Sequence, residues 1–181
     1  MSDERVPPPG PGHHDPGLAA DSTSLSTADL GFLRLSMEVA REARKRGNHP
    51  FGALLVSEDG QVLMQGENTV VTERDCTGHA ELNLIRAAAR QYDPEFLARC
   101  TIYASTEPCP MCAAAIFWGN VRRAVFALST ASLNEIAGAE TEDVMFLPAR
   151  ELLERGRKRI EVLGPYLEEE GRAVHAGFWS Q

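Results

Sequence analysis

The chain has 181 residues, of which 43% are hydrophobic, and a formal net charge of −8 at pH 7. This length suits one domain with its own hydrophobic core, and the acidic balance argues against unaided binding to nucleic acid. The sequence has no run of about 18 apolar residues and its N-terminus lacks an apolar signal core, so we expect a cytoplasmic protein without a membrane span.

The first segment, residues 1–26, is rich in Pro, Gly, Ser, Thr and Asp and poor in large apolar residues. A segment of this composition buries too little apolar surface to compensate for the conformational entropy that it would lose on folding. We therefore predict a disordered tail over residues 1–26 and one globular domain over residues 27–181.

Hydrophobic periodicity and turn residues predict the elements of the domain in chain order. The first half contains a helix that is capped by Ser26 or Thr27 and ends at Gly47, strands over 51–56 and 61–65, a polar loop over 69–78, and a helix over 79–91. The second half contains a strand over 100–105, a helix over 110–118, a strand over 122–128, a short helix over 132–136, a helix from Pro148, a strand over 159–163, and a last helix from Gly164 to about Arg172. Strands that alternate with helices indicate an α/β sandwich.

Two short motifs combine residue types that bind transition metals. They are His79-Ala80-Glu81 and Pro108-Cys109-Pro110-Met111-Cys112. Two thiolates and one imidazole give a tetrahedral zinc ion three protein ligands and leave its fourth position open, as in catalytic zinc sites. A lone Cys-x-x-Cys also occurs in redox motifs, zinc ribbons and clusters. The chain has no second Cys-x-x-Cys for a ribbon, however, and a redox role leaves His79 and Glu81 unexplained.

Both motifs are expected to lie at the start of a helix. Pro110 suits the first helical position, where its missing N–H costs nothing, and Cys109 would then cap that helix. Helix N-termini favour thiolate over thiol and stabilise a developing oxyanion. Glu81 is then interpreted as a proton shuttle, although in isolation it would be a solvated first-turn carboxylate.

These motifs and their flanks resemble the cytidine deaminase-like superfamily, in particular the branch of bacterial guanine deaminases, fungal cytosine deaminase and tRNA adenosine deaminases. The resemblance covers about residues 30–165. It rests on the stretches Pro50-Phe51-Gly52-Ala53, Gly66-Glu67-Asn68, Thr77-Gly78-His79-Ala80-Glu81, and residues 103–112. It implies a three-layer α/β/α sandwich with a mixed five-stranded sheet, a zinc-dependent deaminase domain over residues 27–181, and a homodimer.

The resemblance also implies roles for individual residues. The zinc ligands would be His79, Cys109 and Cys112. Glu81 would shuttle protons, Asn68 would hydrogen-bond the base, and Phe51 would pack against the ring. The amides of Ala80 and Cys109 would bind the zinc hydroxyl region or a ring carbonyl. Gly78 stands where the family more often has Ala, which would slightly widen the pocket.

We expect the substrate to be a free nucleobase or nucleoside, of guanine or cytosine type, or a related modified base or triazine. The acidic tract Glu168-Glu169-Glu170 disfavours an RNA substrate, for which Lys and Arg would be favourable. The basic tract over residues 155–159 argues the other way, but a helix C-terminus also explains it. A tRNA wobble adenosine-to-inosine deaminase is therefore the alternative. A binding module with a structural zinc is a further rival, but it gives Glu81 no role.

Guanine deaminases of this branch use a second acid after the last metal-binding helix. The candidates here are Glu135, Glu140, Glu142 and Asp143. None of them stands out by pattern, so purine and pyrimidine substrates both stay open.

The end of the chain, His175-Ala176-Gly177-Phe178-Trp179, carries aromatic residues that a terminus seldom has without a docking surface. In the guanine deaminase branch the C-terminal segment covers an active site, so we predict that Trp179 and His175 close over the bound base. Alternatively, Phe178 and Trp179 complete the core or a dimer contact. Phe117-Trp118 is a second candidate for the dimer contact.

Overall fold

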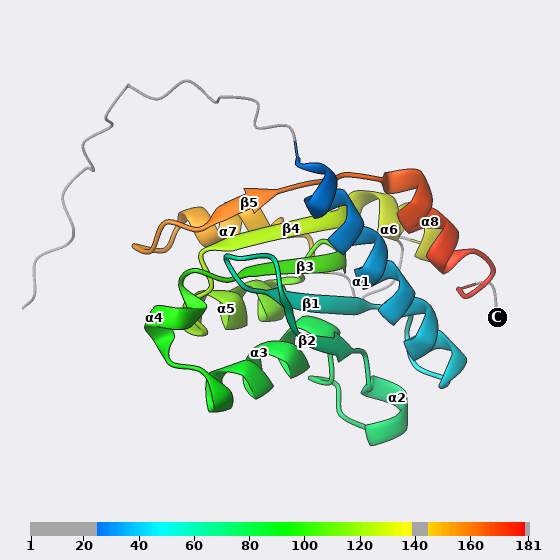
Figure 1. Ribbon diagram of the computed structural model, residues 1–181. Helices are drawn as coiled ribbons and strands as arrows, with labels where there is room; N and C mark the ends of the chain where they lie inside the picture. Colours follow the sequence, from blue (N-terminus) through cyan, green and yellow to red (C-terminus); the bar gives the residue numbers. More distant parts are fainter. Residues whose placement is uncertain (1–24, 139–144, 180–181) are drawn as a thin grey trace, which may run out of the picture.

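The computed structural model describes residues 25–138 and 145–179, which are built around a five-stranded β-sheet (Figure 1). The strands are β1 (Gly52–Val56), β2 (Val62–Glu67), β3 (Thr101–Thr106), β4 (Arg123–Leu128) and β5 (Glu161–Leu163), in the spatial order β2-β1-β3-β4-β5. β1 pairs antiparallel with both β2 and β3, whereas β3, β4 and β5 run parallel. The sheet is therefore mixed, as expected.

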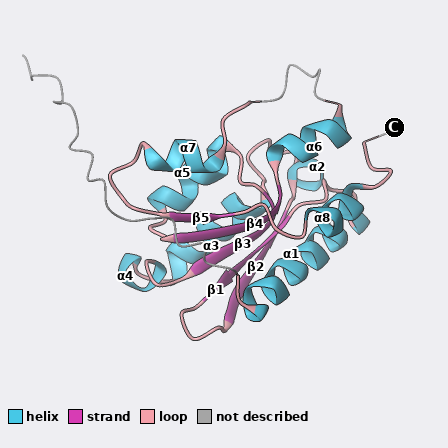
Figure 2. Cartoon of the chain, turned by 90° about the horizontal axis from the view of Figure 1, so that it is seen from above, coloured by secondary structure: helices cyan, strands magenta, loops and turns pink. Residues whose placement is uncertain are grey.

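Helices cover both faces of this sheet (Figure 2). The described residues form the helices α1 (Thr27–Lys45), α2 (Val70–Glu73), α3 (Ala80–Gln91), α4 (Pro94–Leu97), α5 (Pro110–Trp118), α6 (Thr130–Ala137), α7 (Ala149–Glu154) and α8 (Glu168–His175). α1 and α8 pack on one face through residues such as Leu33 and Val174. α3, α5 and α7 pack on the other face through Leu84, Ile116 and Leu153. The three-layer α/β/α sandwich is confirmed.

β1 contributes to the cores on both sides because successive side chains of a strand point to opposite faces. Leu54 and Val56 join the cluster beneath α1, and Ala53 and Leu55 join the cluster beneath α3. All five residues of the strand are buried. A continuous apolar strand is the pattern expected where helices cover both faces of a sheet.

Two glycines let helices approach the sheet more closely than a side chain would allow. A Cβ on Gly66 would collide with the carbonyl oxygen of Ala80 and would lie 2.8 Å from Cβ of Leu84. A Cβ on Gly52 would lie 2.5 Å from the amide nitrogen of Ala40. The contact at Gly66 sets the first residue of α3 directly against β2.

The cap of the first helix agrees with the prediction from the sequence. Ser26 caps α1, because its hydroxyl accepts from the Asp29 amide while the Asp29 carboxylate accepts from the Ser26 amide. The predicted tail lies outside the described residues as far as residue 24. Among the described residues, no helix combines the length and hydrophobicity that crossing a membrane requires.

Two short helices interrupt segments where the sequence predicts none. Residues 69–78, predicted as a polar loop, contain the single turn α2. α4 begins at Pro94 and is capped by Asp93, whose carboxylate accepts from the amide of Phe96. Both are too short to show hydrophobic periodicity, which is the signal on which the prediction depended.

The last helix begins later than the sequence predicts. α8 begins at Glu168, not at Gly164, and it continues to His175, three residues beyond Arg172. Leu167, which precedes it, has a left-handed backbone with φ of 57°, so the helix cannot extend back through that residue. Three glutamates in the first turn suit the positive end of the helix dipole.

Candidate active site

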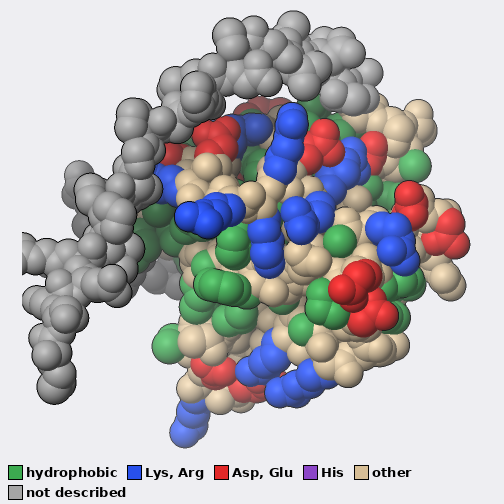
Figure 3. Space-filling model, turned by 90° about the vertical axis from the view of Figure 1, so that its left-hand side faces the viewer, with side chains coloured by type: hydrophobic (Ala, Val, Ile, Leu, Met, Phe, Trp, Pro, Cys, Tyr) green, Lys and Arg blue, Asp and Glu red, His purple; other side chains and the backbone are tan. Residues whose placement is uncertain are grey.

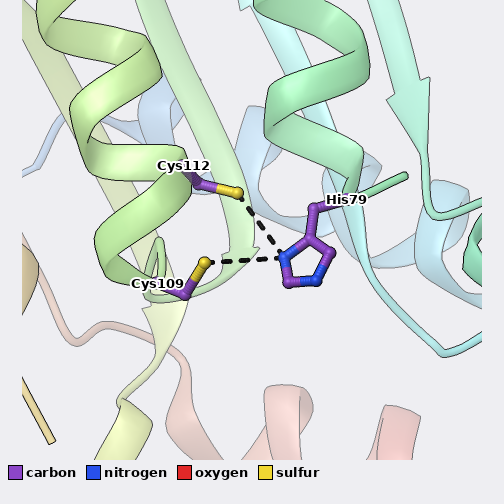
Figure 4. A group of neighbouring side chains, drawn as sticks. All are labelled: His79, Cys109 and Cys112. Carbon is purple, nitrogen blue, oxygen red and sulfur yellow. Dashed lines mark hydrogen bonds between the residues drawn. The ribbon is translucent and has the colours of Figure 1, made fainter. Parts of the chain in front are cut away.

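Two helix starts meet at one side of the sheet, each carrying one of the metal-binding motifs (Figure 4). His79 is the N-cap of α3 and Cys109 is the N-cap of α5, with Pro110 in the first turn. Both caps have extended backbone, and neither uses its side chain to cap its own helix. Their side chains are therefore free to bind a ligand beside the positive ends of two helices.

The side chains of His79, Cys109 and Cys112 converge on one point (Figure 4). Nδ1 of His79 lies 3.5 Å from Sγ of Cys109 and 3.6 Å from Sγ of Cys112. A tetrahedral zinc ion with ordinary bond lengths would separate a nitrogen and a sulfur ligand by about 3.6 Å. The three side chains predicted as ligands thus have the spacing of a zinc site that uses Nδ1 of the histidine.

The surroundings of Cys109 favour its thiolate, which is the form that binds a metal. Hydrogen bonds from Cys112 and His79 lower the pKa of Cys109 to about 4 against the opposing effect of burial. In turn, the hydrogen bond with Cys109 raises the pKa of His79. The donor set of one imidazole and two sulfurs suits zinc, and Cys112, whose pKa is raised chiefly by its hydrogen bond with Cys109, would release its proton when the metal binds.

Glu81 lies in the first turn of α3 and is only 7% exposed. Burial raises the pKa of Glu81 to about 7, and the negative charge of Cys109 acts in the same direction. A carboxyl group that titrates near neutral pH can both take up and release a proton under physiological conditions. The position predicted for a proton shuttle therefore has suitable acidity.

Asn68 and Phe51 are held together by their backbones beside this centre. The amide of Asn68 donates to the carbonyl oxygen of Phe51 over 3.1 Å, at the point where β1 begins and β2 ends. Asn68 is 1% exposed, and its Oδ1 accepts from the amide of Val70 over 3.1 Å. Ala80 follows His79 as the first residue of α3 and is fully buried.

The chain end packs against Phe51 as an aromatic cluster, defined here as His49, Phe51, His175, Phe178 and Trp179. The ring centroids of Phe51 and His175 are 5.3 Å apart, and those of Phe51 and Trp179 are 6.2 Å apart. His175 is 1% exposed, and burial lowers its pKa to about 4. The two chain-end residues predicted to close the site are thus brought to the predicted ring-packing residue.

Sequence reasoning missed His49, which belongs to the same cluster. Its ring centroid lies 5.7 Å from that of Trp179 and 5.9 Å from that of Phe178. Burial lowers the pKa of His49, and the charge of His79 adds to this effect. The one signal in the sequence was its position directly before Pro50-Phe51.

Glu107, two residues before Cys109, was also missed. One carboxylate oxygen accepts from the amide of Thr130, the first residue of α6, over 3.0 Å. The other accepts from the amide of Ala149, the first residue of α7, also over 3.0 Å. A single side chain thereby joins the cysteine motif to the starts of two helices that follow it.

Other residues singled out in the sequence lie elsewhere. Glu135 is largely exposed and pairs with Arg172 over 2.7 Å, which leaves it on the surface. The remaining candidates for a second acid, Glu140, Glu142 and Asp143, lie outside the described residues. Trp118 is 77% exposed, so its side chain is accessible, and the homodimer stays a prediction.

The space at Gly78 differs from what the sequence suggested. A Cβ on this residue would lie 2.8 Å from Oγ1 of Thr69 and 3.1 Å from the amide nitrogen of Val70. The missing methyl group therefore does not widen a pocket, because the neighbouring turn already fills its place.

Comparison with known proteins identifies the family. Residues 26–128 match the family model described as the cytidine and deoxycytidylate deaminase zinc-binding region. A probable cytosine deaminase of Schizosaccharomyces pombe is 41% identical over 162 residues, which cover 87% of this chain and 96% of that protein. The guanine deaminase of Bacillus subtilis is 39% identical over 97 residues, covering 53% of this chain and 62% of that enzyme.

The chain is also similar to a tRNA-specific deaminase and to a solved structure with a bound purine analogue. A tRNA-specific adenosine deaminase of Aquifex aeolicus is 33% identical over 95 residues, covering 52% of this chain and 62% of that enzyme. A crystal structure of a mutant protein in complex with 8-azaguanine superposes with a TM-score of 0.70 at 25% identity, covering 84% of this chain and 85% of that one.

Proposed function

The chain belongs to the cytidine and deoxycytidylate deaminase family, and we propose that it is a zinc-dependent hydrolase that deaminates a free nucleobase or nucleoside of guanine or cytosine type, or a related modified base or triazine. The observation that carries the proposal is the joint presence of three ligand atoms at zinc spacing and a buried acid, Glu81, whose pKa is raised to about 7.

The reaction needs water to add to a ring carbon and ammonia to leave it. Zinc bound by His79, Cys109 and Cys112 would supply a Lewis acid that makes water nucleophilic at neutral pH. Glu81 would take the proton from the attacking water and deliver it to the adjacent ring nitrogen. It would then move the second proton to the amino group, which leaves as ammonia while the ring carbon becomes a carbonyl.

The remaining residues would bind and enclose the ring. The ring of Phe51 would stack on the substrate ring, and the side-chain amide of Asn68 would form a hydrogen bond with the edge of the substrate. The amide of Ala80, at the start of α3, would stabilise negative charge on the developing oxygen. His175 and Trp179 would close over the ring, because they already contact Phe51.

The distribution of charge supports a small substrate over tRNA. Lys and Arg side chains gather on the side of the molecule formed by α4 and the loop between α7 and β5 (Figure 3). α2 and α8, which flank the candidate site, lie at the opposite end of the sheet (Figure 1). At that end α8 begins with Glu168, Glu169 and Glu170, which would repel the phosphates of a tRNA.

Ammonia release from a panel of guanine, cytosine, adenine, their nucleosides and small triazines tests the proposal. We expect turnover of at least one free base or nucleoside by the zinc-loaded protein, and turnover that is at least about 10²-fold slower in Glu81→Gln. Inosine formation on a tRNA anticodon stem-loop, without turnover of free bases, would favour the tRNA alternative. Zinc binding without turnover on any of these substrates would favour a structural zinc.

A further inference from the structure

Asn48 lies outside every motif of the family resemblance, yet its side chain is bound at all its polar atoms and is only 2% exposed. Its Oδ1 accepts from the amides of Val71 and Thr72, over 3.1 and 3.0 Å. Its Nδ2 donates to Oγ1 of Thr72 over 3.0 Å. All of these bonds go to α2, which is far from Asn48 in the sequence.

α2 depends on such bonds because burial does not hold it. None of its four residues is buried, and the side chain of its N-cap, Thr69, makes no capping hydrogen bond. A single helical turn is unstable without outside contacts. Asn68 binds the first amide of the turn, that of Val70, and Asn48 binds the next two. Two asparagines from separate segments therefore cap one turn.

This arrangement fixes the orientation of the Asn68 side chain. The Val70 amide can only donate, so the oxygen of the Asn68 amide must face it. The Nδ2 of Asn68 is then the group left to meet a ligand. If α2 moved, the Val70 amide would move with it, and the Asn68 side chain would lose the partner that orients it.

We propose that Asn48 is a positioning residue: by holding α2, it keeps Asn68 oriented as a hydrogen-bond donor to the substrate. The substrate edge that faces Asn68 must accordingly carry an acceptor, a carbonyl oxygen or an unprotonated ring nitrogen. This inference rests on the proposed function for its substrate, but the link between Asn48 and α2 can be tested without turnover.

Hydrogen exchange measures that link directly. In Asn48→Ala, amide exchange in the peptide covering residues 69–78 should become at least tenfold faster, while exchange in β1 and β3 stays unchanged. Val71→Ala is the matched control, because its exposed side chain is lost while its amide still binds Asn48. Unchanged exchange in Asn48→Ala would overturn the inference, whether or not the protein is an active deaminase.

Kinetics then test the effect on Asn68. With the base that turns over best, Asn48→Ala should raise KM about tenfold and change kcat less than threefold. In an Asn68→Ala background, Asn48→Ala should change KM less than twofold, because its effect passes through Asn68. An equal rise in both backgrounds would show that Asn48 acts only on general stability.

Two conservative variants complete the test. Asn48→Asp keeps the oxygen that binds both amides and should retain a KM within threefold of the wild type, so it also serves if Asn48→Ala fails to fold. Asn68→Asp keeps the oxygen that faces Val70 but replaces the donor with an acceptor, and it should raise KM at least as much as Asn68→Ala. Tight substrate binding by Asn68→Asp would refute the donor role. If the wild type turns over no base while exchange behaves as expected, only the proposed function fails.

Discussion

The indole Nε1 of Trp179 donates a hydrogen bond to Nδ1 of His175 over 3.2 Å, and the two rings lie nearly parallel, 13° apart. Because Nδ1 accepts, neutral His175 carries its hydrogen on Nε2, which lies 3.5 Å from Oγ1 of Thr106. Thr106 ends β3, shortly before the cysteine motif. The chain end is thus attached to the strand that leads into the candidate metal site.

Acid should loosen this attachment. The pKa of His175 is about 4 in the folded chain, below its ordinary value near 6.5. Between these two pH values the unfolded chain binds a proton that the folded chain does not. The free energy of unfolding should therefore decrease as the pH is lowered from 7 to 4, by up to roughly 3 kcal/mol. Urea unfolding from pH 7 to pH 4 measures the loss. His175→Gln should lose less stability over this range, and identical pH profiles would contradict the prediction.

Closure of the site by Trp179 can be tested by shortening the chain. Val174 and His175 are buried, so removal of residues 174–181 would damage the core as well as the site. A chain that ends after Ala176 should keep its fold, yet raise KM at least tenfold in the ammonia assay. Removal of residues 180–181 alone is the control and should leave KM unchanged. Equal KM values for both truncations would exclude a role for Trp179 in closure.

Glu81→Gln separates proton transfer from metal binding. The amide keeps the size of the buried carboxyl but cannot take up a proton, so we expect kcat to fall by about 10²- to 10⁴-fold. Zinc content, measured by elemental analysis, should remain equal to that of the wild type because Glu81 is not among the three converging ligands. Loss of zinc together with activity would instead identify Glu81 as part of the metal site.

Removal of the metal should inactivate the protein reversibly. Without zinc, the thiolate of Cys109 and the sulfur of Cys112 both lie close to Nδ1 of His79 with no ion to hold them together. We expect chelation to abolish ammonia release and lower the melting temperature, and added zinc to restore both. Cys112→Ser should bind zinc more weakly. A chelated protein that keeps full activity would rule out metal-dependent catalysis.

The absence of a side chain at Gly66 should be necessary for the position of α3. A Cβ there would collide with the carbonyl oxygen of Ala80, next to His79, so Gly66→Ala should weaken zinc binding and reduce kcat at least tenfold. Gly31→Ala is the matched control, since a Cβ at this helical position meets nothing within 4 Å. It should stabilise the chain by about 0.5–1 kcal/mol. Zinc affinity that is the same in both variants would contradict this role of Gly66.

The metal motifs could be predicted because their chemistry depends on local order. Pro110 marks a helix start, and Cys109 and Cys112 are close whenever that helix forms. Their convergence with His79 required only that two neighbouring helices begin at the same end of the sheet. The alternation of apolar strands and helices likewise predicted the layers of the fold, because burial on both faces leaves a clear pattern in β1.

The residues that hold the helices around the site could not be predicted in the same way. Asn48 and Glu107 act through hydrogen bonds to amides of residues at least 20 positions away. Such bonds leave no periodicity in the sequence, and they depend on where loops return in space. His49 joins the aromatic cluster because α8 ends beside β1, which is a property of the packed chain.

The bridge made by Glu107 has a consequence for how far changes in the chain spread. The carboxylate fixes Thr130 and Ala149, the first residues of α6 and α7, relative to the cysteine motif. Substitutions farther along either helix should therefore leave Cys109 in place, because both helix starts stay bound to the same side chain. The residues that hold the metal and the residues farther along these helices can then accept changes independently of one another.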